Sequence, residues 1–422
     1  MNQVQPEERT RLQEFANGWR LLFSSLIGLA FASGMLIYNS MGFAFPSLQE
    51  ETGWALSEIS LGLLAFGLTS AALAPLCGYF ADTVGERRIA LIAIPSFGLV
   101  LLGFSLFGDH SLLVFYGLWV LLAVAGVGSL SVTWTRAVNV CFVRGRGLAL
   151  GILLMGTSVA AVVVPQIAVF GLAVDGWRGV FRLVALLPLL IAFPLALFLF
   201  RIPKTSRASE TETARPEYAG ISMREALLSH HFWILWFSLF FVTLAFVGAQ
   251  VNLPGIVEQH GYSKNAAANL LGVLGLSAIV GRVVAGILLD RFWGPGVCFP
   301  LLMLPVASFL LMIGDGTGML GLTLSAAFLG FATGVEGDLL AYLTSRYFGL
   351  RSYGRIAGLL FIPIGIANAI SPYFYALSLD QTGNYNSMLW VAAGLFTVGA
   401  VIILFLGPYP SFDSSERSGA TT

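Results

Sequence analysis

Twelve long apolar segments constrain this chain more than any other feature of its sequence. A helix needs roughly 20 apolar residues to cross the hydrocarbon core of a bilayer. Only 10% of the 422 residues are charged, whereas soluble domains usually carry about a quarter. We therefore expect an all-α membrane protein with twelve transmembrane helices, at 21–45, 57–80, 89–107, 112–136, 147–170, 180–200, 232–252, 267–289, 298–314, 319–342, 356–378 and 387–406.

The distribution of Lys and Arg predicts how the chain crosses the membrane, because cytoplasmic loops carry an excess of both. With the N-terminus in the cytoplasm, 17 of the 22 basic residues fall on the inner side and only Arg178, Arg182 and Lys264 on the outer side. We expect an integral protein of the cell (inner) membrane with both termini cytoplasmic. The first apolar segment is long enough to remain as a helix, so no cleavable signal peptide is expected.

Two short motifs recur after about half of the chain, which indicates an internal duplication. The matched positions lie 207 or 208 residues apart: Gly78/Gly286, Asp82/Asp290, Arg144/Arg351, Gly147/Gly354 and Gly151/Gly358. Duplicated six-helix halves are typical of secondary transporters, which bind substrate between the halves near the middle of the membrane. The duplication predicts two pseudo-symmetric six-helix bundles.

The polar segments between the apolar runs give the expected domain boundaries. The longest of them has linker composition and ends in Ser222-Met-Arg-Glu225, which resembles a capping box that opens a short helix. The expected units are a cytoplasmic N-terminal arm at 1–20, a first bundle at 21–200, a cytoplasmic linker at 201–231, a second bundle at 232–406 and a cytoplasmic tail at 407–422.

Four charged residues lie well inside the apolar segments, away from their outer ends, where a charge is costly and usually faces a bundle interior or an aqueous cavity. Arg136, Arg282 and Asp338 each lie eight residues from a charged residue expected at the cytoplasmic surface, which is about 12 Å along a helix. This spacing predicts one common depth, slightly inside the midplane, with Glu336 about half a turn further out. A small ligand can be held at this depth.

Two interpretations of these charges stay open. Arg136 can pair with an acid such as Asp338 and hold the bundle together, or it can bind an anionic ligand beside Arg282. For Arg282 we favour ligand contact, because its planar guanidinium meets a carboxylate in a bidentate manner and keeps its charge when desolvated. Tyr38 and Asn39, in a polar part of the first helix, either line the same cavity or hold helices together.

Other kinds of chemistry find no support in the sequence. The four histidines lie at loops or helix ends without metal-ligand spacing, and the three cysteines lie in or beside apolar segments. The chain has no phosphate-binding Gly-x-x-x-x-Gly-Lys-Ser/Thr motif, and its net charge of zero does not favour nucleic acid. We expect no metal, no cofactor and no enzymatic activity, and a monomer, since one chain contains both halves of a pathway.

The motif after the second apolar segment, Gly78…Asp82…Gly85-Glu86-Arg87-Arg88, resembles the signature of the major facilitator superfamily. A small residue allows close helix approach, and an acid and two arginines at the cytoplasmic face can form charge-assisted hydrogen bonds. The resemblance implies a gating role for one set of residues, namely Gly78, Asp82, Gly85, Arg87 and Arg88 with the repeat partners Gly286 and Asp290.

Two further motifs resemble the monocarboxylate transporter and oxalate–formate antiporter branch of that superfamily. The segment 142–151, FVRGRGLALG, is similar to the helix 5 signature of the branch, and Arg282 matches its helix 8 arginine. This match implies that Arg282 contacts a carboxylate. Ala278 stands where animal members carry an aspartate, and the first and eleventh segments have no lysine. If protons are coupled, Glu336 or Asp338 is therefore the expected carrier.

The sequence thus predicts a secondary active transporter of a small organic monocarboxylate, similar to lactate or pyruvate, that works by alternating access with proton symport. An organic-anion antiporter and a drug or cation exporter of the same superfamily are alternatives within transport. The buried cation Arg136 disfavours a cationic ligand. A non-transporting membrane receptor is the alternative from another class, and the paired halves disfavour it.

Overall fold

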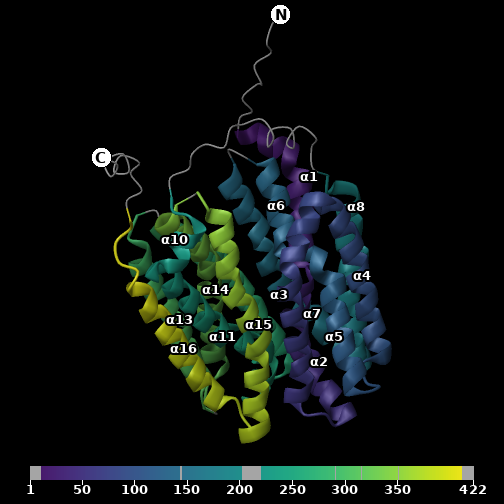
Figure 1. Cartoon of the computed structure of the whole chain (residues 1–422). Coiled ribbons are helices and arrows are strands. Elements are labelled where there is room, and N and C mark those ends of the chain that lie inside the picture. Colours follow the sequence, from purple (N-terminus) through teal and green to yellow (C-terminus); the bar gives the residue numbers. More distant parts are fainter. Residues whose placement is uncertain are drawn as a thin grey trace, which may run out of the picture.

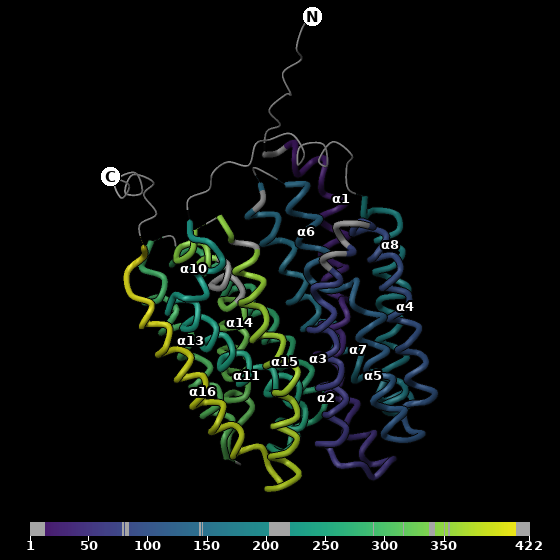
Figure 2. Tube along the Cα trace, in the orientation of Figure 1, coloured from purple at the N-terminus to yellow at the C-terminus, as the bar shows by residue number. Residues whose placement is uncertain are grey.

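The structure, a computed structural model, describes residues 11–142, 145–201, 220–289, 291–314, 316–349 and 351–410. Its helices form two bundles that lie side by side (Figure 1). The first and last described residues lie at the same end of the molecule (Figure 2), which we call the termini end. We call the opposite end the far end.

In the described part of the chain, the first bundle contains ten helical segments. They are α1 (Arg11–Ala30), α2 (Ser33–Thr52), α3 (Leu56–Thr83), α4 (Glu86–Phe107), α5 (Leu112–Gly126), η1 (Val127–Ser129), α6 (Ser131–Cys141), α7 (Arg146–Leu186) with its continuation η2 (Leu187–Ala192), and α8 (Phe193–Leu199). Helix α1 begins inside the segment 1–20 that is expected to be the cytoplasmic N-terminal arm. Inside α7, Asp175 and Gly176 leave the helical conformation, and Gly176 has a φ of 55°, so the chain reverses direction there.

The second bundle contains α11 (His230–Gln259), α12 (Lys264–Leu289), α13 (Gly294–Met312), α14 (Met319–Phe348), α15 (Tyr353–Thr382) and α16 (Asn386–Leu404). The short α10 (Met223–Leu228) precedes it. The predicted capping box at its start is confirmed, because Glu225 N donates to Ser222 Oγ and Ser222 N donates to the Glu225 carboxylate at 2.7 Å.

Eleven helices or helix runs of the described residues are long and apolar enough to cross a membrane. One of the eleven is the run Gly147–Leu199, which turns at Asp175 and Gly176 and therefore supplies two of the twelve expected crossings. The prediction of an all-α protein with two six-helix halves is confirmed in this form.

Two membrane-crossing helices of the first bundle are broken near their middle, which the sequence analysis did not anticipate. The break between α1 and α2 and the break at η1 face each other. Ser33 N donates to Ser129 Oγ at 3.2 Å, and Ser33 Oγ donates to the carbonyl oxygen of Gly126 at 3.3 Å. Backbone groups freed inside a membrane must find such internal partners.

The two bundles touch closely near the far end. A Cβ placed on Gly42 of α2 would lie 1.9 Å from the carbonyl oxygen of Val251 in α11, and one on Gly275 of α12 would lie 2.9 Å from the carbonyl oxygen of Ser158 in α7. A third close approach joins Gly67 of α3 to Ala369 of α15. Three helix pairs thus bring the bundles together, and each pair contains one helix from each bundle.

The same helix faces separate toward the termini end. Residues 7 or 11 apart lie on one face of a helix, so Gly147 and Gly151 share a face with Ser158, Gly286 with Gly275, and Gly358 with Ala369. None of these four glycines has a described neighbour within 4 Å of an added Cβ. The space between the bundles is therefore closed at the far end and open at the termini end.

Candidate functional site

Arg282 lies on the face of α12 that looks toward the first bundle. It follows Gly275 by seven residues, which is two helical turns or about 10 Å toward the termini end. Gly275 itself contacts α7 of the first bundle, so the half-buried Arg282 lies beyond that contact, where the bundles have separated. The backbone of Arg282 thus lies where the faces of the two bundles have separated, while Nε and Nη1 of its guanidinium are buried.

The backbone around Arg282 is held by a close approach of α12 and α14. A Cβ on Gly334 would lie 1.9 Å from the carbonyl oxygen of Ala278 and 2.9 Å from the backbone nitrogen of Arg282. Likewise, a Cβ on Gly281 would lie 2.1 Å from the carbonyl oxygen of Phe331. These close approaches hold the Arg282 backbone against α14.

Asn39 and Gln250 close the space between the bundles on its far-end side. The Gln250 amide Nε2 donates to Asn39 Oδ1 at 3.0 Å, and Asn39 Nδ2 donates to the carbonyl oxygen of Met35 at 2.8 Å. Asn39 is buried and belongs to the first bundle, while Gln250 belongs to the second. The neighbouring Tyr38 packs its ring edge-on against Phe66 at 6.3 Å.

Arg136 lies elsewhere than the equal-depth argument predicted. Its Nε is 3.0 Å from Oε1 of Glu86, a side chain with only 4% of its surface exposed, and Glu86 is the first residue of α4 at the termini end. The equal-depth estimate counted eight helical residues from Arg136 to Arg144, but α6 ends at Cys141, so Arg136 lies closer to the helix end than expected. Arg136 thus forms a salt bridge within the first bundle.

Glu336 faces the inside of the second bundle. Thr243 Oγ1 of α11 donates to its carboxylate at 2.8 Å. Glu336 lines a small cavity of about 20 Å³ whose other lining residues are mostly Leu, Val and Ile of α11, α13, α14 and α16. A cavity of this size holds about one water molecule. Asp338 belongs to the same helix, but its side chain lies outside the described part of the structure.

The gating motif forms a junction of several helices at the termini end. Gly85 has a φ of 95°, as expected for the tight turn between α3 and α4. Arg87 Nη2 donates to the carbonyl oxygen of Leu197 in α8 at 2.9 Å, while Arg88 is exposed. Asp82 lies in the last turn of α3, not after its end as the sequence suggested. The predicted partner Asp290 lies outside the described residues.

A family model described as Major Facilitator Superfamily matches residues 26–372. The chain belongs to the Major Facilitator Superfamily. Superfamily membership accounts for the paired bundles and for the space between them, and it makes this chain an integral membrane transporter.

Several superfamily members resemble the chain over most of its length. A probable sulfoacetate transporter of Cupriavidus necator is 25% identical, over 90% of this chain and 92% of its own. A 3-(3-hydroxy-phenyl)propionate transporter of Escherichia coli is also 25% identical, over 92% and 93%. The human monocarboxylate transporter 11 is 24% identical, over 89% and 81%.

Among solved structures, an inward-facing bacterial homologue of the human lysosomal transporter Spinster has the same fold. It aligns with a TM-score of 0.64 and 19% identity, over 93% of this chain and 95% of its own. This likeness confirms the superfamily fold.

Proposed function

We propose that this chain is a secondary active transporter of a small organic monocarboxylate, which it carries across the cytoplasmic membrane by alternating access. The observation that supports the proposal is the position of Arg282 in α12, two turns beyond the closed contact at Gly275 and on the side of the helix that faces the first bundle. A guanidinium there offers the planar pair of N–H donors that a carboxylate accepts.

The names of the relatives support a carboxylate or sulfonate substrate. They include transporters of sulfoacetate and of 3-(3-hydroxy-phenyl)propionate as well as a monocarboxylate transporter. An aromatic acid presents the same carboxylate group as lactate and pyruvate, so a screen for the substrate of this chain should include both kinds of acid. On this proposal the open termini end faces the cytoplasm, in agreement with the excess of Lys and Arg there.

We assign proton coupling to Glu336. An ionised carboxylate is costly in a mostly apolar cavity, and one hydrogen bond from Thr243 compensates only part of that cost. Protonation removes the charge. Glu336 lies inside the second bundle, whereas Arg282 lies at its surface toward the first bundle, so the proton and the substrate occupy different sites. Asp338 is the alternative carrier on the same helix.

Counterflow in proteoliposomes tests the proposal. Vesicles loaded with unlabelled acid are diluted into labelled lactate, pyruvate or 3-(3-hydroxyphenyl)propionate, and a cationic dye serves as the competing class. We expect uptake of at least one acid and none of the dye. Replacing a bidentate guanidinium by an ammonium removes about 1.5–3 kcal/mol, so Arg282→Lys should lower apparent affinity by roughly 10- to 100-fold.

Arg224→Lys is the matched control, because Arg224 is exposed on α10, outside the membrane-crossing helices. Its transport should equal that of the wild type. Normal acid uptake by folded Arg282→Lys would refute the role of Arg282, and dye uptake without acid uptake would refute the proposed substrate class.

A further inference from the structure

The first turn of α3 begins at a residue that cannot cap it. Ala55 occupies the N-cap position of this helix, where Ser, Thr, Asp and Asn are preferred because their side chains accept from first-turn N–H groups. Ala55 N donates to the Glu58 carboxylate at 2.9 Å. Within the described part of the chain, however, no group of the first bundle accepts from Ser57 N.

The missing acceptor comes from the second bundle. Asp380 Oδ2, in the last turn of α15, accepts from Ser57 N at 2.8 Å. Asp380 follows Ala369 by 11 residues, so both lie on the face of α15 that meets α3. A negative charge is also favoured at the N-terminus of a helix. The cap of α3 is therefore complete only while the two bundles touch at the far end.

The far-end contact between α3 and α15 has an equivalent in another pair of helices. A Cβ on Gly67 would lie 2.6 Å from Cβ of Ala369, and one on Gly275 would lie 2.9 Å from Cβ of Ala161. Gly67 and Gly275 are 208 residues apart, and so are Ala161 and Ala369, which is the offset of the internal repeat. The junction of α3 with α15 can therefore be compared with that of α12 with α7, position by position.

The two junctions differ in the origin of the helix cap. The repeat partner of Ala55 is Ser263, 208 residues later, and Ser263 Oγ accepts from Ala266 N at 3.3 Å. Helix α12 is thus capped from within the second bundle. The repeat partner of Asp380 is Leu172, whose side chain cannot accept a hydrogen bond. Asp380 therefore takes over at α3 the role that Ser263 has beside its own helix.

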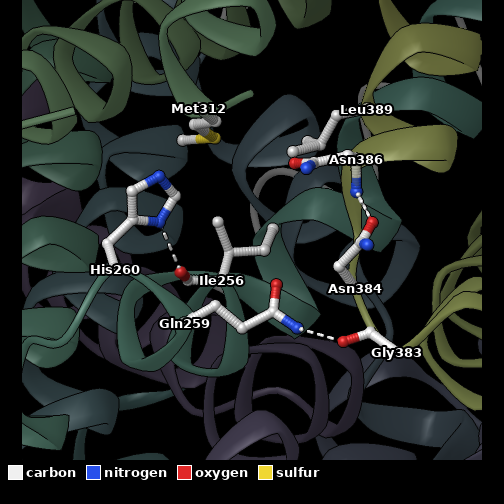
Figure 3. A pocket seen from close by; sticks show the side chains of 8 residues that line it. All are labelled: Ile256, Gln259, His260, Met312, Gly383, Asn384, Asn386 and Leu389. Atoms are coloured by element: carbon white, nitrogen blue, oxygen red, sulfur yellow. Dashed lines mark hydrogen bonds between the residues drawn. The ribbon is translucent and has the colours of Figure 1, made fainter. Parts of the chain in front are cut away.

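Both ends of the bond between Asp380 and Ser57 are anchored in their own bundles. In the first bundle, Tyr116 Oη of α5 donates to the carbonyl oxygen of Glu58 at 3.0 Å. In the second bundle, Gln259 Nε2 of α11 donates to the carbonyl oxygen of Gly383, just after α15, at 3.2 Å (Figure 3). Neither helix end can follow the other bundle, so the bond must break when the bundles separate at the far end.

We propose that Asp380 is a latch that stabilises the closed far end by capping α3 from the opposite bundle. The inference rests on the proposed function, because opening of the far end is a step of alternating access. Replacing a capping side chain by alanine shifts an equilibrium by about 2- to 30-fold, and here that equilibrium is between the closed and the open far end. Asp380 is a positioning residue, since it acts through α3.

Double electron–electron resonance between spin labels at Leu113 and Leu320 tests this proposal in the purified full-length protein. The two leucines lie at the far end in the first turns of α5 and α14, one in each bundle, and are 82% and 75% exposed. Asp380→Ala should lower the ratio of the short to the long distance by about 2- to 30-fold. Asp380→Asn keeps an acceptor oxygen and should lower this ratio less.

A second substitution separates capping from any other effect of Asp380. Ala55→Asp gives α3 a carboxylate of its own at the N-cap position, which can accept from Ser57 N whether the far end is closed or open. In this background Asp380→Ala should change the ratio of distances by less than about twofold, because two substitutions that act on one interaction are not additive.

Ser263→Ala is the matched control, because it removes a cap that lies wholly within the second bundle, and it should leave the distances unchanged. The proposal is overturned if Asp380→Ala leaves the distances unchanged, or if Ser263→Ala shifts them as much as Asp380→Ala does. It is also overturned if Asp380→Ala keeps its full effect beside Ala55→Asp. The distances are measured without substrate, so a failure of acid transport leaves this test unaffected.

Discussion

Gly42 controls how closely the bundles meet at the far end, so Gly42→Ala should shift the protein away from this conformation. The added Cβ would lie 1.9 Å from the carbonyl oxygen of Val251. Carbon and oxygen atoms approach to about 3.3 Å, so α2 and α11 must separate by about 1.4 Å. Both partners are backbone, and no flexible side chain can yield.

The cost of such overpacking is typically about 1–3 kcal/mol, which corresponds to a change of roughly 5- to 150-fold in the ratio of two conformations. Spin labels at the exposed residues Glu50 and Gln381, near the far ends of α2 and α15, report the separation by double electron–electron resonance. We expect the short-distance population to fall in Gly42→Ala and a longer distance to appear.

Two further substitutions separate this effect from a general disturbance of the helices. Gly394→Ala makes the same change in α16, where an added Cβ has no described neighbour within 4 Å, and should leave the distances unchanged. In Gly286→Leu the leucine side chain also enters open space in this conformation, but it blocks closure of the bundles at the termini end. We therefore expect the population with the short distance between the two spin labels to increase. Unchanged distances and uptake in Gly42→Ala would refute the inference that this contact limits far-end closure.

Two other predictions address the buried polar groups. Glu336→Gln should make acid uptake independent of an imposed pH gradient while counterflow continues, because the amide cannot take up a proton. Glu50→Gln changes an exposed glutamate in the same way and serves as the control. Acid uptake driven by the pH gradient in Glu336→Gln would exclude Glu336 as the proton carrier. Ser129→Ala leaves Ser33 N without its acceptor, which costs about 1–3 kcal/mol and should lower the apparent melting temperature in detergent. Thr135→Ala, whose hydroxyl bonds only within its own helix, should lower it less.

The general architecture follows from local properties of the sequence, which explains why it was predictable. Membrane-crossing helices must satisfy their own backbone hydrogen bonds, so apolar length alone reveals them. The capping box at Ser222 and the turn at Gly85 are equally local, since each depends on residues within one helical turn. The structure confirms both features.

The breaks in the first bundle were not predictable in the same way. Neither the break before Ser33 nor η1 contains a proline, and the freed backbone groups are satisfied by side chains about 95 residues away along the chain. The error at Arg136 has a different cause, since its depth was counted along a helix to Arg144 and α6 ends at Cys141. Similarly, Thr243 became part of the Glu336 site only because α11 and α14 cross there.

The described far-end connections are short, as at Gly53–Ala55, Asp175–Gly176 and Gly383–Tyr385, and each of them joins helices of one bundle. The only covalent link between the bundles leaves α8 at the termini end, where residues 200–222 can span up to roughly 75 Å. The link therefore does not limit how far the bundles separate. The interface between the bundles consists of close helix contacts, as at Gly42, Gly67 and Gly275, and of hydrogen bonds such as Gln250 to Asn39. Two separately synthesised half-chains therefore carry the surfaces they need to assemble into a working carrier.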